Sequence, residues 1–138
     1  MMTNNRWFIF DTNVLISAFL FSQSKPRQAL DQAQDIGVIV LSNSVLSELK
    51  EVLYRPKFDR YLTQQTRQEL LKYLIENAQF LDVIEQIDEC RDPKDNKYLE
   101  LAVSAKAECI VTGDDDLLVL NPWRSIEILT AQDFLAFK

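Results

Sequence analysis

The sequence has 138 residues, of which 47% are hydrophobic, with only two glycines, four prolines and no histidine. This length and apolar content suit one domain with a sizeable core and argue against disorder, while the absence of histidine excludes Ser-His and Cys-His nucleophiles and imidazole acid–base catalysis. The net charge of -6 argues weakly against a nucleic-acid partner, because phosphate contacts need lysine and arginine.

Short apolar segments alternate with longer segments of helical periodicity along the chain. In chain order, the predicted elements are a strand at 7–10, helices at 12–22 and 25–35, a strand at 38–41, helices at 43–55 and 63–79, a strand at 80–84, a helix at 93–106, a strand at 109–112, a helix at 116–120, a strand at 126–129 and a helix at 131–137. Continuous apolar strands are typical of parallel sheets buried on both faces. We therefore expect an α/β, doubly wound fold with a mostly parallel sheet of about five strands, helices on both faces, and a single domain over residues 1–138.

Four acidic residues are expected to meet at one edge of this sheet. Asp11 directly follows the first strand, and Asp114 follows the strand at 109–112. Glu48 lies in the helix after the second strand, and Asp95 lies near the start of the helix after the third. Sites in such sheets lie beyond the carboxyl ends of the strands, so we expect these four side chains to lie close together.

Each of these acids also has a purely structural interpretation. Asp11 could cap the helix that follows it, and Asp92 followed by Pro93 is typical of a helix N-cap, so we interpret Asp92 as structural. Asp95 then falls in the first helical turn, where the helix dipole favours an acid. Glu48 considered alone would be a solvated surface residue.

The three consecutive aspartates Asp114, Asp115 and Asp116 are harder to explain by capping. Capping needs only one or two of them, and their mutual repulsion would be resolved by a bound cation. A cluster of Asp and Glu without Cys or His suits Mg²⁺ or Mn²⁺, which prefer oxygen ligands. Together the acids predict a metal site, with Asp115 pointing away from it.

Residues 50–72 are locally basic despite the negative net charge. They carry six lysine and arginine residues against three acids, whereas residues 82–100 carry seven acids against three bases. A basic patch beside an acidic centre could contact phosphates, although a solvated helix surface explains the same residues. The candidates for phosphate contact are Lys50, Arg55, Lys57 and Arg60.

Four segments, in order, resemble the motifs of PIN-domain proteins. The segment "FDTNVLIS" resembles the first motif, with Asp11 as the metal-binding acid and Thr12 and Asn13 as its supporting residues. The segment "SNSVLSELKEVL" resembles the second motif and places the helix glutamate of the family at Glu48. Together with the two motifs below, the resemblance covers about residues 6–120.

The third and fourth motifs supply the remaining acids. The segment "DPKDNKYLELA" resembles the third motif, in which the acid leading the helix corresponds to Asp95. The segment "IVTGDDDLL" is similar to the fourth, with Thr112 in a supporting position and either Asp114 or Asp116 as the principal acid. The resemblance thus implies that Asp11, Glu48, Asp95 and Asp114 are catalytic metal ligands, with Asp116 as a further ligand.

The resemblance is strongest to prokaryotic PIN proteins regarded as toxins of toxin–antitoxin pairs. It implies a metal-dependent endoribonuclease that uses Mg²⁺ or Mn²⁺, acts on RNA, forms a homodimer and is held inactive by a small antitoxin protein. One alternative is a PIN-like module that binds RNA or protein without cleavage. The other is a haloacid-dehalogenase-like phosphatase, although such enzymes carry a second Asp where this chain has Asn13.

The sequence also predicts where the protein acts. No apolar run approaches the roughly 20 residues that a membrane span needs, and the N-terminal residues show no hydrophobic signal segment. We therefore expect a cytoplasmic protein that does not associate with membranes.

Overall fold

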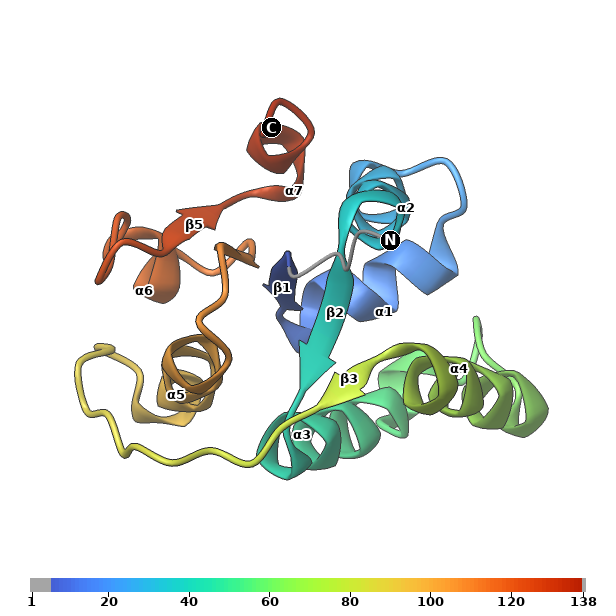
Figure 1. The fold of residues 1–138 in the computed structure, drawn as a ribbon. Helices are drawn as coiled ribbons and strands as arrows, with labels where there is room; N and C mark the ends of the chain where they lie inside the picture. The colour runs from blue at the N-terminus through green and yellow to red at the C-terminus, as the bar shows by residue number, and fades with distance from the viewer. Residues whose placement is uncertain (1–5, 138) are drawn as a thin grey trace.

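A computed structural model of the chain describes residues 6–137, and its centre is a parallel sheet (Figure 1). The strands are β1 Trp7–Phe10, β2 Val38–Leu41, β3 Gln79–Phe80, β4 Cys109–Val111 and β5 Glu127–Leu129. They lie in the order β3-β2-β1-β4-β5, and all neighbouring strands pair in parallel. The expected α/β class and five-stranded sheet are confirmed.

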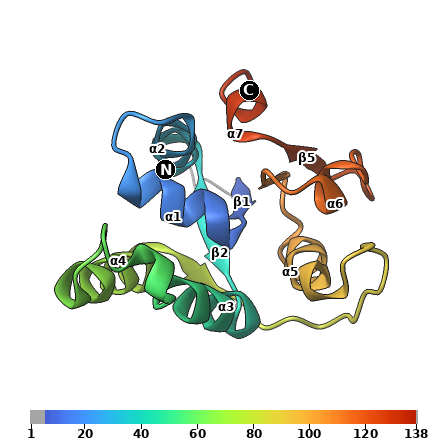
Figure 2. The same cartoon turned by 180° about the vertical axis from the view of Figure 1, so that it is seen from behind.

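Helices cover both faces of the sheet, as predicted. They are α1 Thr12–Leu20, α2 Lys25–Ile36, α3 Asn43–Leu53, α4 Gln64–Asn77, α5 Asn96–Ala105, α6 Asp115–Leu118 and α7 Ala131–Phe134. Figures 1 and 2 show α1 and α2 on one side of β1, and α5 and α6 on the other. This double coverage explains why the central strands are apolar along their whole length.

Side-chain caps set where most of the helices begin. In six of the helices named above, an oxygen of the preceding residue's side chain accepts a hydrogen bond from a backbone N–H of the first turn. These capping residues are Asp11 for α1, Ser24 for α2, Ser42 for α3, Thr63 for α4, Asp114 for α6 and Thr130 for α7. Each such contact is typically worth about 1 kcal/mol, so the helix starts are encoded locally.

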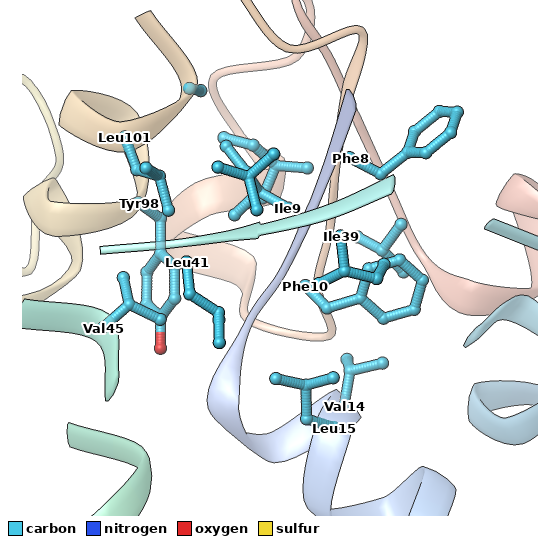
Figure 3. Packing of buried hydrophobic residues seen from close by; sticks show 14 of the residues in the cluster. Phe8, Ile9, Phe10, Val14, Leu15, Ile39, Leu41, Val45, Tyr98 and Leu101 are labelled. Atoms are coloured by element: carbon cyan, nitrogen blue, oxygen red, sulfur yellow. The ribbon is translucent and has the colours of Figure 1, made fainter. Parts of the chain in front are cut away.

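The strand β1 forms the centre of the hydrophobic core (Figure 3). Phe8, Ile9 and Phe10 are fully buried. Phe8 and Phe10 pack edge-on against Phe134 of α7, with ring centroids 5.3 and 5.9 Å apart. Ile9 points to the opposite face, on the side where Tyr98 of α5 lies. The core therefore continues through the sheet and anchors the carboxyl end of β1 from both sides.

The strand order creates a switch point between β1 and β4. From β1 the chain proceeds outward to β2 and β3, and then crosses to the other side of β1 to form β4 and β5. Phe10 lies opposite Val111, and the Asp11 N–H donates to the Val111 carbonyl at 3.0 Å. The residues that follow β1 and β4 are therefore neighbours at the kind of crevice where α/β sheets bind ligands.

The strand predicted at 80–84 is wrong in extent, because strand pairing ends with β3 and one further hydrogen bond joins the Leu81 N–H to the Leu41 carbonyl at 3.0 Å. Beyond it, the Ile84 N–H donates to the Ser104 hydroxyl at 3.1 Å and the Ile87 N–H donates to the Glu100 carboxylate at 3.0 Å. Both acceptors belong to α5. The segment leaves the sheet edge because its backbone groups find side-chain partners on that helix.

Several helix boundaries also differ from the prediction. The helices predicted to end at residues 22, 79 and 137 end at Leu20, Asn77 and Phe134. The helix predicted to reach residue 55 ends at Leu53, since Arg55 must be extended (ψ 141°) before Pro56. The helix predicted from residue 93 begins as a 3-10 turn, Pro93–Asp95, before α5. Within residues 6–137, no helix combines the length and apolar character needed to cross a membrane.

Candidate active site

A cavity of about 520 Å³ opens beyond the carboxyl ends of β1 and β4. Four predicted acids from four separate parts of the chain line it, and they are Asp11, Glu48, Asp95 and Asp114. Its lining also carries four basic residues, Arg55, Lys57, Lys94 and Lys97. The structure therefore brings together the acids that the sequence places more than a hundred residues apart.

Asp11 is held rigidly at the end of β1. Its Oδ1 accepts the Val14 N–H at 2.8 Å as the cap of α1, and its Oδ2 accepts the Thr112 hydroxyl. Only 6% of the residue is exposed. Burial raises the pKa of Asp11, and the hydrogen bonds from Thr112 and Val14 oppose that rise. Capping and a site role are thus compatible for this carboxylate.

Thr112 connects the acids that follow the two central strands. The residue is fully buried, and its Oγ1 donates to Asp11 while accepting the Asp114 N–H at 3.0 Å. Asp114 in turn caps α6, because its Oδ1 accepts the Asp116 N–H at 2.9 Å. The supporting position predicted for Thr112 therefore corresponds to direct contacts with both neighbouring site residues.

Asp95 is a second buried carboxylate of the cavity. It is 4% exposed, and its Oδ2 is buried with no hydrogen-bond partner among residues 6–137. Burial raises the pKa of Asp95 to about 7, with further contributions from hydrogen bonding to Asp114 and from the charges of Asp114, Asp92 and Glu48. Such a carboxylate needs a proton or a cation at neutral pH.

Glu48 is positioned by α5 rather than by its own helix. Its Oε1 accepts from the Lys97 ammonium at 2.7 Å and from the Tyr98 hydroxyl at 3.2 Å. The Tyr98 hydroxyl also accepts the Thr12 N–H at 3.1 Å and lies 2.8 Å from the Thr12 hydroxyl. The buried Tyr98 therefore links the starts of α1 and α5 to the glutamate of α3.

The remaining predicted acids and supporting residues lie at or beyond the edge of the cavity. Asn13 is exposed and lines it, whereas Asp116 does not line it and pairs with Arg91 at 2.7 Å. Asp115 is exposed on α6, outside the cavity lining. A ligand role for Asp116 stays a prediction.

The four predicted phosphate contacts divide into two pairs. Arg55 and Lys57 line the cavity, whereas Lys50 and Arg60 do not. Arg55 forms an ion pair with Glu51 at 2.6 Å, also on the cavity wall. Arg55 and Lys57 flank Pro56 just after the end of α3, whereas Lys50 lies within α3 and Arg60 lies beyond the 3-10 turn Pro56–Phe58.

Lys94, Lys97 and Tyr98 were not predicted as site residues. All three surround Asp95 in the sequence and line the cavity. The available signal was their spacing: Lys97 and Tyr98 lie two and three residues after an acid that starts a buried helix face. Their contact with Glu48 depends on how α3 and α5 pack, which local sequence does not report.

The chain is similar to known proteins in sequence and in fold. A family model described as PIN domain matches residues 8–116. An uncharacterized protein of Methanocaldococcus jannaschii is 34% identical over 117 residues, which cover 82% of this chain and 74% of that protein.

Two solved structures share the fold at 14% sequence identity. VapBC2 from Rickettsia felis, solved bound to a DNA fragment from their promoter, gives a TM-score of 0.60 and covers 88% of this chain and 96% of that one. PAE2754 from Pyrobaculum aerophilum gives a TM-score of 0.63 and covers 96% of this chain and 89% of that one. With most of its length matched by the family model, and with this fold, the chain belongs to the PIN-domain family.

Proposed function

We propose that the chain is a metal-dependent endoribonuclease that hydrolyses RNA phosphodiester bonds. The observation that carries the proposal is the convergence of four predicted acids on one cavity whose lining also carries four lysine and arginine side chains. Acids alone would suit a cation, and bases alone would suit a phosphate. Their combination suits a phosphodiester that is brought to a metal centre.

The donor set fits Mg²⁺ or Mn²⁺. The predicted ligands Asp11, Glu48, Asp95 and Asp114 offer only carboxylate oxygens, which are the ligands that these ions prefer. Asp95 also carries a buried oxygen without a hydrogen-bond partner among residues 6–137, which a cation would satisfy. The chemistry supplied by the ion, when bound, is activation of water for attack on phosphorus and compensation of charge on the phosphate oxygens.

The protein's own residues prepare this chemistry by holding the carboxylates in place. Thr112 fixes the rotamer of Asp11, and Asp114 is fixed by its capping contact. Tyr98 and Lys97 hold the Oε1 atom of Glu48, which leaves its Oε2 atom as the ligand or as the group that orients attacking water. Such preorganisation is what gives fixed charges their catalytic value.

The basic side chains of the cavity lining form the proposed path of the RNA backbone. Arg55 and Lys57 line the cavity, so we assign them to phosphate contact ahead of Lys50 and Arg60. No group in the proposed site requires attack by a 2′-hydroxyl. A preference for RNA would then arise from substrate shape and contacts with the sugar.

The proposed biological context is that of a cytoplasmic toxin with a small antitoxin partner, acting as a homodimer. The motif resemblance to toxin-type PIN proteins supports it, as does the shared fold with the Rickettsia felis VapBC2 structure. A neighbouring small open reading frame whose product copurifies with this chain would test the antitoxin partner directly.

The catalytic proposal is tested with an end-labelled single-stranded RNA incubated with Mg²⁺, Mn²⁺ or EDTA. We expect internal cleavage with either ion and none in EDTA. Undiminished cleavage in EDTA would contradict the metal mechanism. Metal-dependent binding without cleavage would favour a binding module, and release of inorganic phosphate from a phosphomonoester would favour a phosphatase.

A further inference from the structure

The segment 54–61, between α3 and α4, interleaves aromatic and basic side chains. Its sequence is YRPKFDRY, and we call it the aromatic arm. In Figures 1 and 2 this part of the chain runs from the end of α3 to the start of α4, on the side of α3 away from α5. Arg55 and Lys57 line the acidic cavity, whereas Arg60 and Tyr61 do not. The arm therefore begins at the cavity wall and continues away from it.

A buried arginine of α4 holds the arm in a fixed shape. Arg67 is only 5% exposed, and it donates to the Leu53 carbonyl at 2.9 Å and to the Asp59 carboxylate at 3.0 Å. Its guanidinium carbon lies 5.4 Å from the centroid of the Tyr54 ring. Asp59 is the only acid of the arm, so the arm is both preorganised, which lowers the entropic cost of binding a ligand, and free of unpaired negative charge.

Two tyrosine rings of the arm are open to solvent. Tyr61 is 58% exposed and Tyr54 is 38% exposed. The guanidinium carbon of Arg60 lies 5.7 Å from the centroid of the Tyr61 ring. Tyrosine rings bury large apolar areas when they find a partner. An exposed ring beside a cation therefore offers a flat apolar face to a ligand that also carries negative charge.

The arm also carries positive charge that no carboxylate offsets. Among residues 6–137, neither Lys57 nor Arg60 forms an ion pair. The Lys57 ammonium instead lies 5.1 Å from the centroid of the Phe58 ring. Since the whole chain has a net charge of -6, this is a local feature. Cations that alternate with exposed rings match the alternation of phosphates and bases in a single-stranded nucleic acid.

We propose that the aromatic arm is a stacking platform for unpaired nucleotides. Tyr61 and Tyr54 stack on bases, and Arg60 contacts a phosphate farther along the strand than those held by Arg55 and Lys57 at the cavity. Bases within a duplex are already stacked, so the platform selects single strands, and it accepts any base because every base has a π-face. The proposal rests on the proposed function for the identity of the strand as RNA.

The test is the binding of fluorescein-labelled oligouridylate to the full-length protein, measured by fluorescence anisotropy at low salt in EDTA. The chelator prevents metal-dependent cleavage, so binding is read apart from catalysis. An abasic ribose-phosphate oligomer of the same length reports the phosphate contacts alone. Phe21→Ala is the matched control for Tyr61→Ala, since it removes a ring of similar exposure (53%) at the end of α1.

We expect Tyr61→Ala to weaken binding of oligouridylate by about 10-fold, as for the loss of one base stack, and to leave binding of the abasic oligomer nearly unchanged. Tyr61→Phe keeps the ring and should restore the native affinity. Phe21→Ala should bind both oligomers like the native protein. Circular dichroism checks folding, and Tyr61→Leu replaces Tyr61→Ala if the latter unfolds.

The possible failures separate this proposal from the catalytic one. If Tyr61→Ala binds oligouridylate like the native protein, or weakens both oligomers equally, Tyr61 does not stack on a base, even if the protein cleaves RNA. If the native protein binds no oligouridylate, the platform is wrong and the exposed tyrosines fit a protein partner. The expected binding pattern without RNA cleavage in Mn²⁺ would support the platform and overturn only the catalytic proposal.

Discussion

Replacement of Asp95 by asparagine should make the metal-free protein more stable at neutral and alkaline pH. Asp95 is buried beside other acids, and its carboxyl has a pKa raised to about 7 from its ordinary value of 3.8. Asparagine has the same shape and no charge, and its amide can donate to the Asp114 carboxylate. The variant therefore removes repulsion without opening a cavity.

The size of the effect follows from the raised pKa of Asp95. An acid whose pKa is higher in the folded state destabilises the protein progressively as the pH rises from its unfolded pKa to its folded pKa, and fully above the latter. At 1.36 kcal/mol per pH unit, this difference corresponds to at most about 4 kcal/mol above pH 7. Because neighbouring acids share the repulsion and relax, we expect a gain of about 2 kcal/mol.

The pH dependence distinguishes this cause from better packing. At pH 8 in EDTA, urea unfolding of Asp95→Asn should show the full gain, with a melting temperature higher by several degrees. At pH 4 the native carboxyl is largely protonated in the folded protein, so the gain should nearly vanish. Mn²⁺ should reverse the order at pH 8, because it stabilises only the protein that binds it well.

An exposed aspartate supplies the control for that experiment. Asp115→Asn removes the same charge from the surface of α6 and should change the free energy of unfolding by less than about 0.5 kcal/mol. If Asp95→Asn is less stable than the native protein at pH 8 in EDTA, or if its gain persists at pH 4, Asp95 is not held under electrostatic strain.

Three further outcomes are expected. Replacement of both Arg55 and Lys57 by glutamate should reduce the slope of log K for RNA binding against log salt concentration by about 1.4, as expected for two lost contacts with single-stranded phosphates. The Mn²⁺ affinity should be nearly unchanged. An unchanged slope would show that the RNA binds elsewhere. Gly37→Ala should lower the free energy of unfolding in urea by about 1 to 3 kcal/mol, because its new Cβ would collide with the backbone that precedes β1. The control Gly113→Ala should be tolerated, since its Cβ meets no atom within 4 Å. Equal stability of the two variants would contradict this. Tyr98→Phe should lower the free energy of unfolding by about 1 to 2 kcal/mol, since it removes a buried hydroxyl with several partners, and an unchanged unfolding curve would show that this network contributes little.

Local patterns predicted the central strands well and the sheet edge poorly. The strands at 7–10 and 38–41 are found at the predicted residues, because a fully buried parallel strand must be apolar throughout. The segment at 80–84 has similar composition but lies at the edge. Whether it stays in the sheet or follows α5 depends on partners such as Ser104 and Glu100, which are distant in the sequence.

The acids of the site were predictable for a topological reason. Residues that follow parallel strands meet at one sheet edge, so Asp11 and Asp114 could be placed together without knowledge of any contact. The contact of Lys97 with Glu48 follows from the packing of α5 against α3 and has no local signature. Sequence patterns therefore indicate which acids converge, while packing decides which bases accompany them.

The central claim is that the acids of the cavity perform RNA cleavage, and Asp11 tests it most directly. The measurement is the rate of single-stranded RNA cleavage in saturating Mn²⁺ by the native protein, by Asp11→Asn and by the surface control Asp115→Asn. We predict a loss of about 100-fold or more for Asp11→Asn and a native rate for Asp115→Asn. Cleavage by folded Asp11→Asn at the native rate would contradict the account.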